Sequence, residues 1–135
     1  MYLLVLIQSI QNNMWKMIKV SVITVCYNAE KTIERTVESV ISQSYPNFEY
    51  VIVDGGSRDS TLDIIEKYSL NISSLISEPD NGIYDAMNKG VQISTGMYVI
   101  FMNSGDIFVD NNVLLNLFSN IHDFPDVIYG NTVLL

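Results

Sequence analysis

The sequence predicts an α/β protein whose mainly parallel sheet is covered by helices on both faces. Short runs of β-branched and apolar residues alternate along the chain with longer segments in which apolar residues recur at helical spacing. Strands separated by helices of this length form right-handed βαβ units, and such units build a parallel sheet with two covered faces. Ligands of these sheets bind beyond the carboxyl ends of the strands. The residues that follow each strand are therefore the first candidates for chemistry.

Two strand–helix units are expected in the first half of the chain. The strands are expected at residues 19–26 and 48–53, and the helices at residues 30–42 and in a segment that ends at residue 67. The β-branched run at residues 19–26 is typical of a buried strand. We expect Asn28 to cap the first helix and Ser57 or Asp59 to cap the second, because such side chains accept hydrogen bonds from the free N–H groups of a helix start. The inward-facing residues are expected to be Ile33, Val37, Val40 and Ile41 in the first helix, and Leu62 and Ile65 in the second.

The second half continues the alternation. Strands are expected at residues 72–77 and 97–102, helices at residues 83–91 and 113–118, and the start of a fifth strand at residues 127–129. The inward face of the 83–91 helix is expected to consist of Ile83, Ala86, Met87 and Val91. No internal repeat, low-complexity stretch or linker divides the chain, and 135 residues are enough for one domain with its own core.

The composition is that of a globular protein with an acidic surface. Apolar residues make up 48% of the chain and charged residues 16%, which is ordinary for a folded domain. Fifteen acidic residues against seven basic ones give a net charge of -8. At long range this charge repels nucleic acids and anionic lipid headgroups. It also repels a nucleotide diphosphate, so a protein of this charge that binds one needs a metal ion, a helix N-terminus or a well-placed lysine.

The single cysteine and the single histidine exclude several kinds of site. Cys26 lies in an apolar run and is expected to be a small buried hydrophobic residue. One cysteine forms neither an internal disulfide nor a cysteine-rich zinc site. His122 cannot form a histidine metal cluster by itself, and it is expected in an exposed loop.

Residues 1–16 are expected to be an extension that lies outside the domain. The apolar run at residues 2–7 is far shorter than the roughly 20 residues that cross a membrane. No basic residue precedes the run and no small-residue cleavage site follows it, which argues against a secretory signal. A disordered extension, a mis-called start with Met17 as the true first residue, and a weak membrane-surface anchor all stay open.

Polar residues gather where each predicted strand ends. They are Tyr27 and Asn28 after the first strand, residues 54–61 (DGGSRDST) after the second, residues 78–82 (EPDNG) after the third, and residues 103–106 (NSGD) after the fourth. Carboxylates on one rim repel one another unless a cation or hydrogen-bond donors balance them, so this rim favours a functional site. A structural alternative stays open for single residues. Residues 54–57 could be a tight turn into a capped helix, and Asp59 a favourable charge at the helix N-terminus.

The combination of these segments, in this order, resembles the family 2 glycosyltransferases. The segments that carry the resemblance are residues 21–28 (SVITVCYN), residues 54–57 with Asp59 and Thr61, and residues 103–106. Residues 78–90 (EPDNGIYDAMNKG) are similar to a subgroup that acts in bacterial surface-polysaccharide assembly. The resemblance covers residue 18 to about residue 131. It implies the GT-A fold, a Rossmann-like three-layer α/β/α sandwich, with residues 17–135 as its nucleotide-sugar-binding part.

The resemblance also implies a role for individual positions. The segment from Thr24 to Asn28 would line the nucleoside pocket, Asp54 would hydrogen-bond the base, and Gly55 would let the ligand approach the backbone. Asp106 would bind Mg²⁺ or Mn²⁺ on the diphosphate. The implied nucleotide-sugar-binding residues are Thr24, Tyr27, Asn28, Asp54, Gly55, Ser57, Asp85, Lys89 and Ser104. For Lys89, a solvated helix charge is the alternative.

The chain departs from the family pattern at two points. Gly105 stands where many members carry a second Asp, so this element keeps one carboxylate for the metal, which suits a hard cation held mainly by substrate phosphates and water. The catalytic base and the acceptor-binding segments of the family are expected beyond Leu135. The later carboxylates are expected in loops and caps; these are Asp110, Asp123 and Asp126.

The resemblance implies an enzyme that transfers a sugar, with inversion and metal dependence, in cell-surface polysaccharide synthesis. A UDP-sugar is the expected donor and a saccharide or lipid-linked molecule the expected acceptor. The expected location is the cytoplasm, with the inner face of the cell membrane as an option. A truncated or degenerate nucleotide-binding module without transferase activity is the alternative. A dinucleotide oxidoreductase is disfavoured because no G-x-G-x-x-G follows the first strand, and a phospho-receiver domain because its lysine after a fifth strand is missing.

Overall fold

A single parallel sheet forms the centre of the molecule. The structure is a computed structural model that describes residues 18–121 and 125–128. Its strands are β1 (Val20–Cys26), β2 (Phe48–Asp54), β3 (Ser74–Ser77) and β4 (Tyr98–Phe101). They lie in the order β3-β2-β1-β4, and every neighbouring pair is parallel. The predicted parallel sheet is confirmed.

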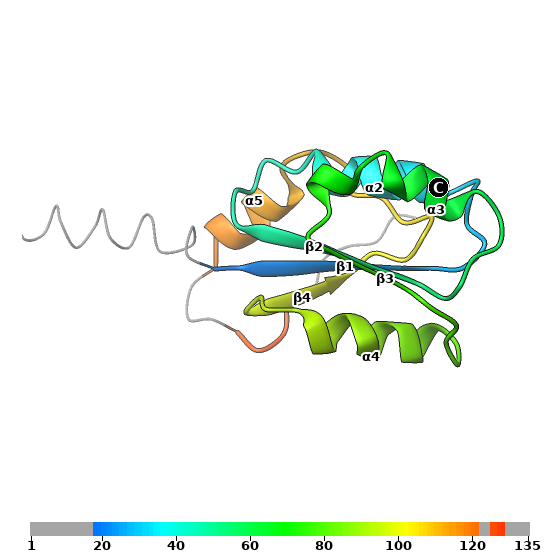
Figure 1. Cartoon of the computed structure of the whole chain (residues 1–135). Coiled ribbons are helices and arrows are strands. Elements are labelled where there is room, and N and C mark those ends of the chain that lie inside the picture. The colour runs from blue at the N-terminus through cyan, green and yellow to red at the C-terminus, as the bar shows by residue number, and fades with distance from the viewer. Residues whose placement is uncertain (1–17, 122–124, 129–135) are drawn as a thin grey trace, which may run out of the picture.

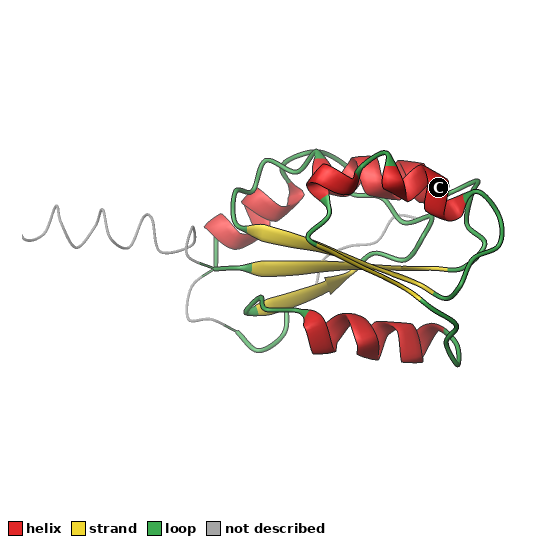
Figure 2. Cartoon of the chain, in the orientation of Figure 1, coloured by secondary structure: helices red, strands yellow, loops and turns green. Residues whose placement is uncertain are grey.

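Helices cover both faces of this sheet. They are α2 (Ile33–Ile41), α3 (Thr61–Glu66), the short 3-10 helix η2 (Ser69–Asn71), α4 (Ile83–Ile93) and α5 (Val113–Ser119). Helices α2, α3 and α5 lie on one face, and α4 lies alone on the other (Figures 1 and 2). The predicted three-layer α/β/α arrangement is thereby confirmed.

The core consists of two apolar clusters, one on each face of the sheet. Alternate residues of β1 enter different clusters: Val20 and Val22 pack with α2 and α5, whereas Ile23 and Val25 pack with Ala86 of α4. Every residue of β1 is buried, as expected for a central parallel strand whose two faces are both covered. Cys26 is buried as predicted, and burial together with the neighbouring carboxylate of Asp54 raises its thiol pKa to about 12.

The helix starts differ from the sequence predictions. Helix α2 begins at Ile33, not at residue 30, and Asn28 does not cap it. Asn28 instead adopts a left-handed backbone conformation, and its side chain accepts a hydrogen bond from the N–H of Arg58. At the start of α3, Asp59 accepts the N–H of Thr61, whereas Ser57 donates to Asp54. Of the two proposed caps, only Asp59 contacts the helix.

The inward face of α4 is narrower than predicted. Ala86 is buried and Met87 packs against the second cluster, but Ile83 and Val91 are 48% and 45% exposed, so their predicted burial is wrong. A single helix covers this face of the sheet, and its contacts are with β1 and β2. Residues at either side of the contact line therefore remain in solvent.

The last described residues do not form a fifth strand. Val127 and Ile128 lie outside any strand, and Tyr129 falls outside the described residues, as do residues 1–16, Met17, His122 and Asp123. The side chain of Asp110 accepts the N–H of Asn112, which agrees with its predicted loop role, and Asp126 is exposed.

Among the described residues, no helix has the length and apolar character needed to cross a membrane.

Candidate functional site

The four loops at the carboxyl ends of the strands each contain one residue with positive φ. These residues are Asn28 (φ 47), Gly56 (φ 83), Gly82 (φ 106) and Gly105 (φ 107). Positive φ is uncommon for a residue other than glycine, and such conformations persist where the surrounding structure enforces them. We call the edge formed by these loops the rim. Its backbone is specialised at the position where ligands of parallel α/β sheets bind.

The first two rim loops hold each other. The backbone N–H of Asn28 donates to Ser57 Oγ at 2.8 Å, and the N–H of Arg58 donates to Asn28 Oδ1 at 2.9 Å. Ala29 adds a bond from its N–H to Thr61 Oγ1 at 2.7 Å. The structure thus brings together Asn28 and Ser57, which were predicted to share a site. Tyr27 lies beside them with 61% of its surface exposed.

Asp54 is a buried structural anchor of the second loop. It is fully buried, and its Oδ2 accepts hydrogen bonds from the N–H of Gly56 (3.1 Å), the N–H of Ser57 (2.9 Å) and the hydroxyl of Ser77 (2.8 Å). Its Oδ1 accepts the Ser57 hydroxyl at 2.5 Å. In this structure the loop folds back over the strand end and both Asp54 oxygens accept hydrogen bonds, and the expectation that Asp54 hydrogen-bonds a base stays a prediction.

Thr24 is also part of the core. Its side chain is fully buried, and its hydroxyl shares a hydrogen bond of 2.9 Å with the hydroxyl of Tyr50. The side chain lies away from solvent in this structure, and the expectation that Thr24 lines a nucleoside pocket stays a prediction.

The Asp80 side chain lies against the second rim loop. A Cβ atom built on Gly55 would stand 2.6 Å from Asp80 Oδ2, so any larger residue at that position would displace the Asp80 carboxylate. The other oxygen of Asp80 accepts the N–H of Gly82 at 2.9 Å. Asp80 was in a motif noted from the sequence, but it received no role. Its approach to a glycine 25 positions earlier has no signal in a single sequence.

Lys89 and Asp85 form one ionic group with the third loop. Lys89 Nζ lies 2.9 Å from Glu78 and 3.5 Å from Asp85, and it donates to the carbonyl of Pro79 at 3.3 Å. The hydrogen bond to Glu78 and the charge of Asp85 raise the pKa of Lys89. The N–H of Asn81 and the charge of Lys89 lower the pKa of Asp85. Lys89 is therefore an ordered, charged group of the rim and not an isolated solvated charge.

The fourth loop holds Asp106 at the surface. Asp106 is exposed, and its Oδ2 accepts the N–H of Asn103 at 3.0 Å. The preceding residues are fixed by α2: Ser104 Oγ lies 2.8 Å from the Thr32 hydroxyl, and the N–H of Gly105 donates to Thr36 Oγ1 at 2.9 Å. The chain thus presents one carboxylate from this loop on a defined backbone.

The donor set at Asp106 suits a hard cation with few protein ligands. Within the described part of the chain, no group of three or more His, Cys, Asp or Glu side chains could hold a metal ion. A carboxylate is an oxygen ligand of the kind that Mg²⁺ prefers, and this ion commonly keeps water and substrate phosphates in its shell. Asn103 Oδ1 is a further oxygen at this loop. It is buried and has no hydrogen-bond partner among the described residues, and sequence reasoning gave it no separate role.

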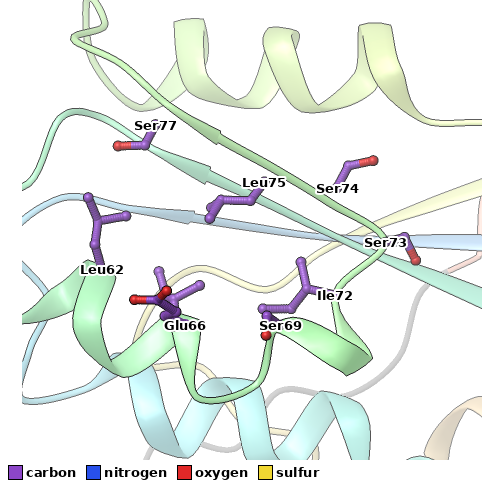
Figure 3. A pocket seen from close by; sticks show the side chains of 9 residues that line it. Leu62, Glu66, Ser69, Ile72, Ser73, Ser74, Leu75 and Ser77 are labelled. Atoms are coloured by element: carbon purple, nitrogen blue, oxygen red, sulfur yellow. The ribbon is translucent and has the colours of Figure 1, made fainter.

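The rim is separate from a cavity that lies beside strand β3. That cavity, of about 410 Å³, is enclosed by α3, η2 and β3, and none of the predicted site residues lines it (Figure 3). Leu62, Ile72 and Leu75 contribute apolar walls, and the lining contains serines and one acidic residue but no basic one. Such a lining offers a diphosphate no positive charge.

The family comparison agrees with the motifs on the rim. The model of glycosyl transferase family 2 matches residues 21–134. The chain belongs to glycosyltransferase family 2. It is 32% identical over 119 residues to the PGL/p-HBAD biosynthesis glycosyltransferase of Mycobacterium tuberculosis, covering 84% of this chain and 46% of the relative. It is 43% identical over 95 residues to the putative teichuronic acid biosynthesis glycosyltransferase TuaG of Bacillus subtilis, covering 68% of this chain and 37% of that one.

Solved structures show the same fold. S. aureus TarS in complex with UDP aligns with a TM-score of 0.67 at 33% identity, over 73% of this chain and 30% of that one. The TarS complex with UDP-GlcNAc aligns with a TM-score of 0.60 at 35% identity, over 64% and 26% of the two chains. The mannosyltransferase PcManGT from Pyrobaculum calidifontis aligns with a TM-score of 0.69 at 22% identity, over 84% and 39%. The fold of the family 2 chain is therefore GT-A, and the chain spans less than half the length of these relatives.

Proposed function

We propose that this chain is the nucleotide-sugar-binding part of a glycosyltransferase that uses a UDP-sugar. The observation that carries the proposal is the rim itself, where loops of a family 2 fold present Tyr27, Asn28 and the carboxylate of Asp106, and where Lys89 of α4 binds the third loop. The titles of two TarS structures with 33–35% identity name UDP and UDP-GlcNAc as ligands, which supports a uridine nucleotide.

Each rim loop would then contact a different part of the donor. Tyr27 offers an exposed aromatic face to the base, and the interlocked loops of Asn28 and Ser57 form the wall beside it. Asp80, instead of the buried Asp54, is the carboxylate available to accept hydrogen bonds from the nucleoside. Lys89 brings a positive charge to the diphosphate in a chain of net charge -8.

Asp106 would hold Mg²⁺ or Mn²⁺ with the help of substrate phosphates and water. When bound, such an ion supplies Lewis-acid stabilisation of the leaving diphosphate. The chain's own contribution is to hold one carboxylate at the surface through the Asn103 N–H, which fixes its orientation. The inverting course of the transfer is part of the proposal, and we assign the base to none of the described residues.

The acceptor and the cellular role come from the relatives' names. TuaG is named for teichuronic acid biosynthesis, and the Escherichia coli relative WfgD (31% identity over 113 residues) is named a β-1,3-glucosyltransferase acting on GlcNAc-diphosphoundecaprenol. These names support a saccharide or lipid-linked acceptor in cell-surface polysaccharide synthesis. A cytoplasmic location, with peripheral association at the inner face of the membrane, completes the proposal.

The second candidate function is a nucleotide-binding module that transfers nothing. It rests on one observation: the match covers 46% of the mycobacterial relative, so the aligned residues make up less than half of that relative's length. We expect the 135-residue chain to bind UDP without glycosylating an acceptor, apart from slow hydrolysis of the UDP-sugar. Multiple turnovers to a glycosylated product with Mn²⁺ and a saccharide acceptor would exclude this second function.

Calorimetric titration with UDP tests the binding that both functions require. We expect measurable affinity with Mn²⁺ or Mg²⁺ and a large loss in excess chelator, because the acidic rim repels an uncomplexed diphosphate. Tyr27→Ala should weaken binding about tenfold or more, the loss of roughly 1–3 kcal/mol of base stacking. Leu70→Ala is the matched control, since Leu70 is fully exposed on η2. Equal affinity in chelator would overturn the metal-bridged site, and no affinity under either condition would overturn the proposal.

A further inference from the structure

Helix α2 carries a polar stripe beside its apolar one. Thr32, Thr36, Ser39 and Gln43 recur at intervals of four, three and four residues, which places them on one side of the helix and its flanking turns. We call these four residues the α2 seam. Thr36 is fully buried and Gln43 is 7% exposed. Buried polar side chains are costly unless they are hydrogen-bonded, so the partners of the seam explain why these residues are there.

Every residue of the seam hydrogen-bonds the segment that runs from the fourth rim loop to α5. Thr32 Oγ1 lies 2.8 Å from Ser104 Oγ, Thr36 Oγ1 accepts the N–H of Gly105 at 2.9 Å, and Ser39 Oγ accepts the N–H of Phe108 at 3.3 Å. Gln43 donates to the carbonyl of Asp110 at 2.6 Å and accepts the N–H of Leu114 at 3.1 Å. Most of these partners are backbone groups that follow the end of β4. The α2 seam therefore supplies hydrogen-bond partners to backbone N–H and C=O groups that lie outside the sheet.

The rim end of the seam fixes the residues directly before Asp106. Ser104 and Gly105 are both bonded to α2, and Gly105 holds a φ of 107 that side-chain-bearing residues rarely adopt. Among the residues that the structure describes, Asp106 is bonded within the loop, through its N–H to the Asn103 carbonyl at 2.9 Å and through its Oδ2 to the Asn103 N–H. The position of the Asp106 carboxylate therefore depends on the anchorage of Gly105.

We propose that Thr36 is a positioning residue for the metal-binding loop and that the rim end of the α2 seam holds Asp106 in place through Gly105. The inference rests on the proposed role of Asp106 as a metal ligand. It goes beyond that role by assigning the geometry of the site to a buried hydroxyl that touches neither metal nor substrate. The same helix follows the loop of Asn28, so α2 ties the expected nucleoside side of the rim to the expected metal side.

The test compares Thr36→Val with two matched variants. Valine keeps the shape of threonine but leaves the Gly105 N–H without its acceptor. Gln43→Met removes the hydrogen bonds at the far end of the seam, and Thr36→Ser keeps the hydroxyl. We measure Mn²⁺ affinity in the presence of UDP from the electron paramagnetic resonance signal of free Mn²⁺. We expect about a tenfold loss for Thr36→Val, equivalent to about 1.4 kcal/mol, and affinity within about twofold of the parent for Thr36→Ser and Gln43→Met.

A second readout separates this inference from the proposed function. Amide hydrogen exchange at Gly105 reports the anchorage without any metal, and we expect it to accelerate at least tenfold in Thr36→Val but not in Thr36→Ser or Gln43→Met. Unchanged Gly105 exchange in Thr36→Val overturns the inference, as does a loss of Mn²⁺ affinity in Gln43→Met as large as in Thr36→Val. If the parent chain shows no Mn²⁺-dependent UDP binding while Gly105 exchange responds as expected, the proposed metal site fails and the anchorage stands.

Discussion

Strand β2 carries a buried carboxylate near each end, and the two are stabilised in different ways. Near the amino end, Glu49 is 9% exposed and pairs with Lys19 Nζ at 2.7 Å. It also accepts the Ser21 hydroxyl at 2.6 Å and both the N–H and the hydroxyl of Thr95, at 2.6 and 2.8 Å. At the carboxyl end, Asp54 is fully buried and accepts bonds from backbone N–H groups and serine hydroxyls. Among the described residues, no cation is paired with it.

The difference separates a structural end of the sheet from the end that is proposed to bind the donor. At the amino end a cation cancels the charge, and the packing is tight: a Cβ on Gly96 would stand 2.6 Å from the backbone nitrogen of Ser21. At the carboxyl end the described partners of Asp54 are uncharged hydrogen-bond donors, and Asp80 and Asp106 are further carboxylates of the rim. Carboxylates without a paired cation attract one, whereas at the amino end Lys19 already pairs with Glu49.

Asp54→Ala should give the largest loss of stability. The change removes the acceptor of the N–H groups of Gly56 and Ser57 and of the Ser77 hydroxyl, and each hydrogen bond to a charged group contributes about 1.5–3 kcal/mol. We expect a loss of about 3 kcal/mol or more in the free energy of unfolding, measured by urea denaturation. Asp54→Asn keeps one acceptor oxygen and should lose less. A loss below about 0.5 kcal/mol for Asp54→Ala, typical of a surface site, would contradict the buried-anchor role.

Glu49→Ala should destabilise the chain less, by about 1–3 kcal/mol. The side chain of Lys19 is 41% exposed, so water can solvate its ammonium group once Glu49 is removed. Asp54 is fully buried, whereas Glu49 is 9% exposed. Urea denaturation of the two alanine variants under the same conditions measures the difference. If Glu49→Ala proves as costly as Asp54→Ala, the contrast between the two ends of β2 does not hold.

Acid should weaken the amino end specifically. Burial alone would raise the pKa of Glu49, but hydrogen bonds from Lys19, Ser21 and Thr95 lower it to about 2 from an ordinary value near 4.5. The stabilisation is present above pH 4.5 and is lost as the pH falls towards 2, because the unfolded chain takes up the proton first. We expect the free energy of unfolding to fall by about 1–2 kcal/mol more between pH 5 and pH 2 in the parent than in Glu49→Gln. Parallel pH curves for the two proteins would show that Glu49 does not contribute this linkage.

Lys89→Met should have the smallest effect on stability and a clear effect on binding. Its ion pairs with Glu78 and Asp85 lie at the surface, where such pairs contribute about 0–1 kcal/mol. The affinity for UDP with Mn²⁺ should nevertheless fall, because the variant removes the ordered positive charge of the rim. Lys67→Met is the matched control, since Lys67 forms a surface ion pair with Glu34 at 3.5 Å on the α2–α3 side. Equal affinities for the two variants would place Lys89 outside the ligand site.

The sequence by itself determined the fold class and the order of the four strands and their helices along the chain, and it located the polar loops at the strand ends. Hydrophobic periodicity and β-branched runs are local properties, so residues 19–26 and 48–53 could be assigned to strands without knowing what they pack against. The same holds for Cys26, whose apolar neighbours already predicted its burial.

The tertiary structure alone decided which polar side chains of the rim face solvent. Asp54 and Thr24 are buried because a loop and a neighbouring strand close over them, and Asp80 reaches the rim because Gly55 leaves room for it. The α2 seam joins residues about 70 positions apart, such as Thr36 and Gly105, which are 69 positions apart. Exposure and hydrogen bonding of this kind depend on pairs of segments that are distant in sequence, and the periodicity of a single chain carries no information about which pairs will meet.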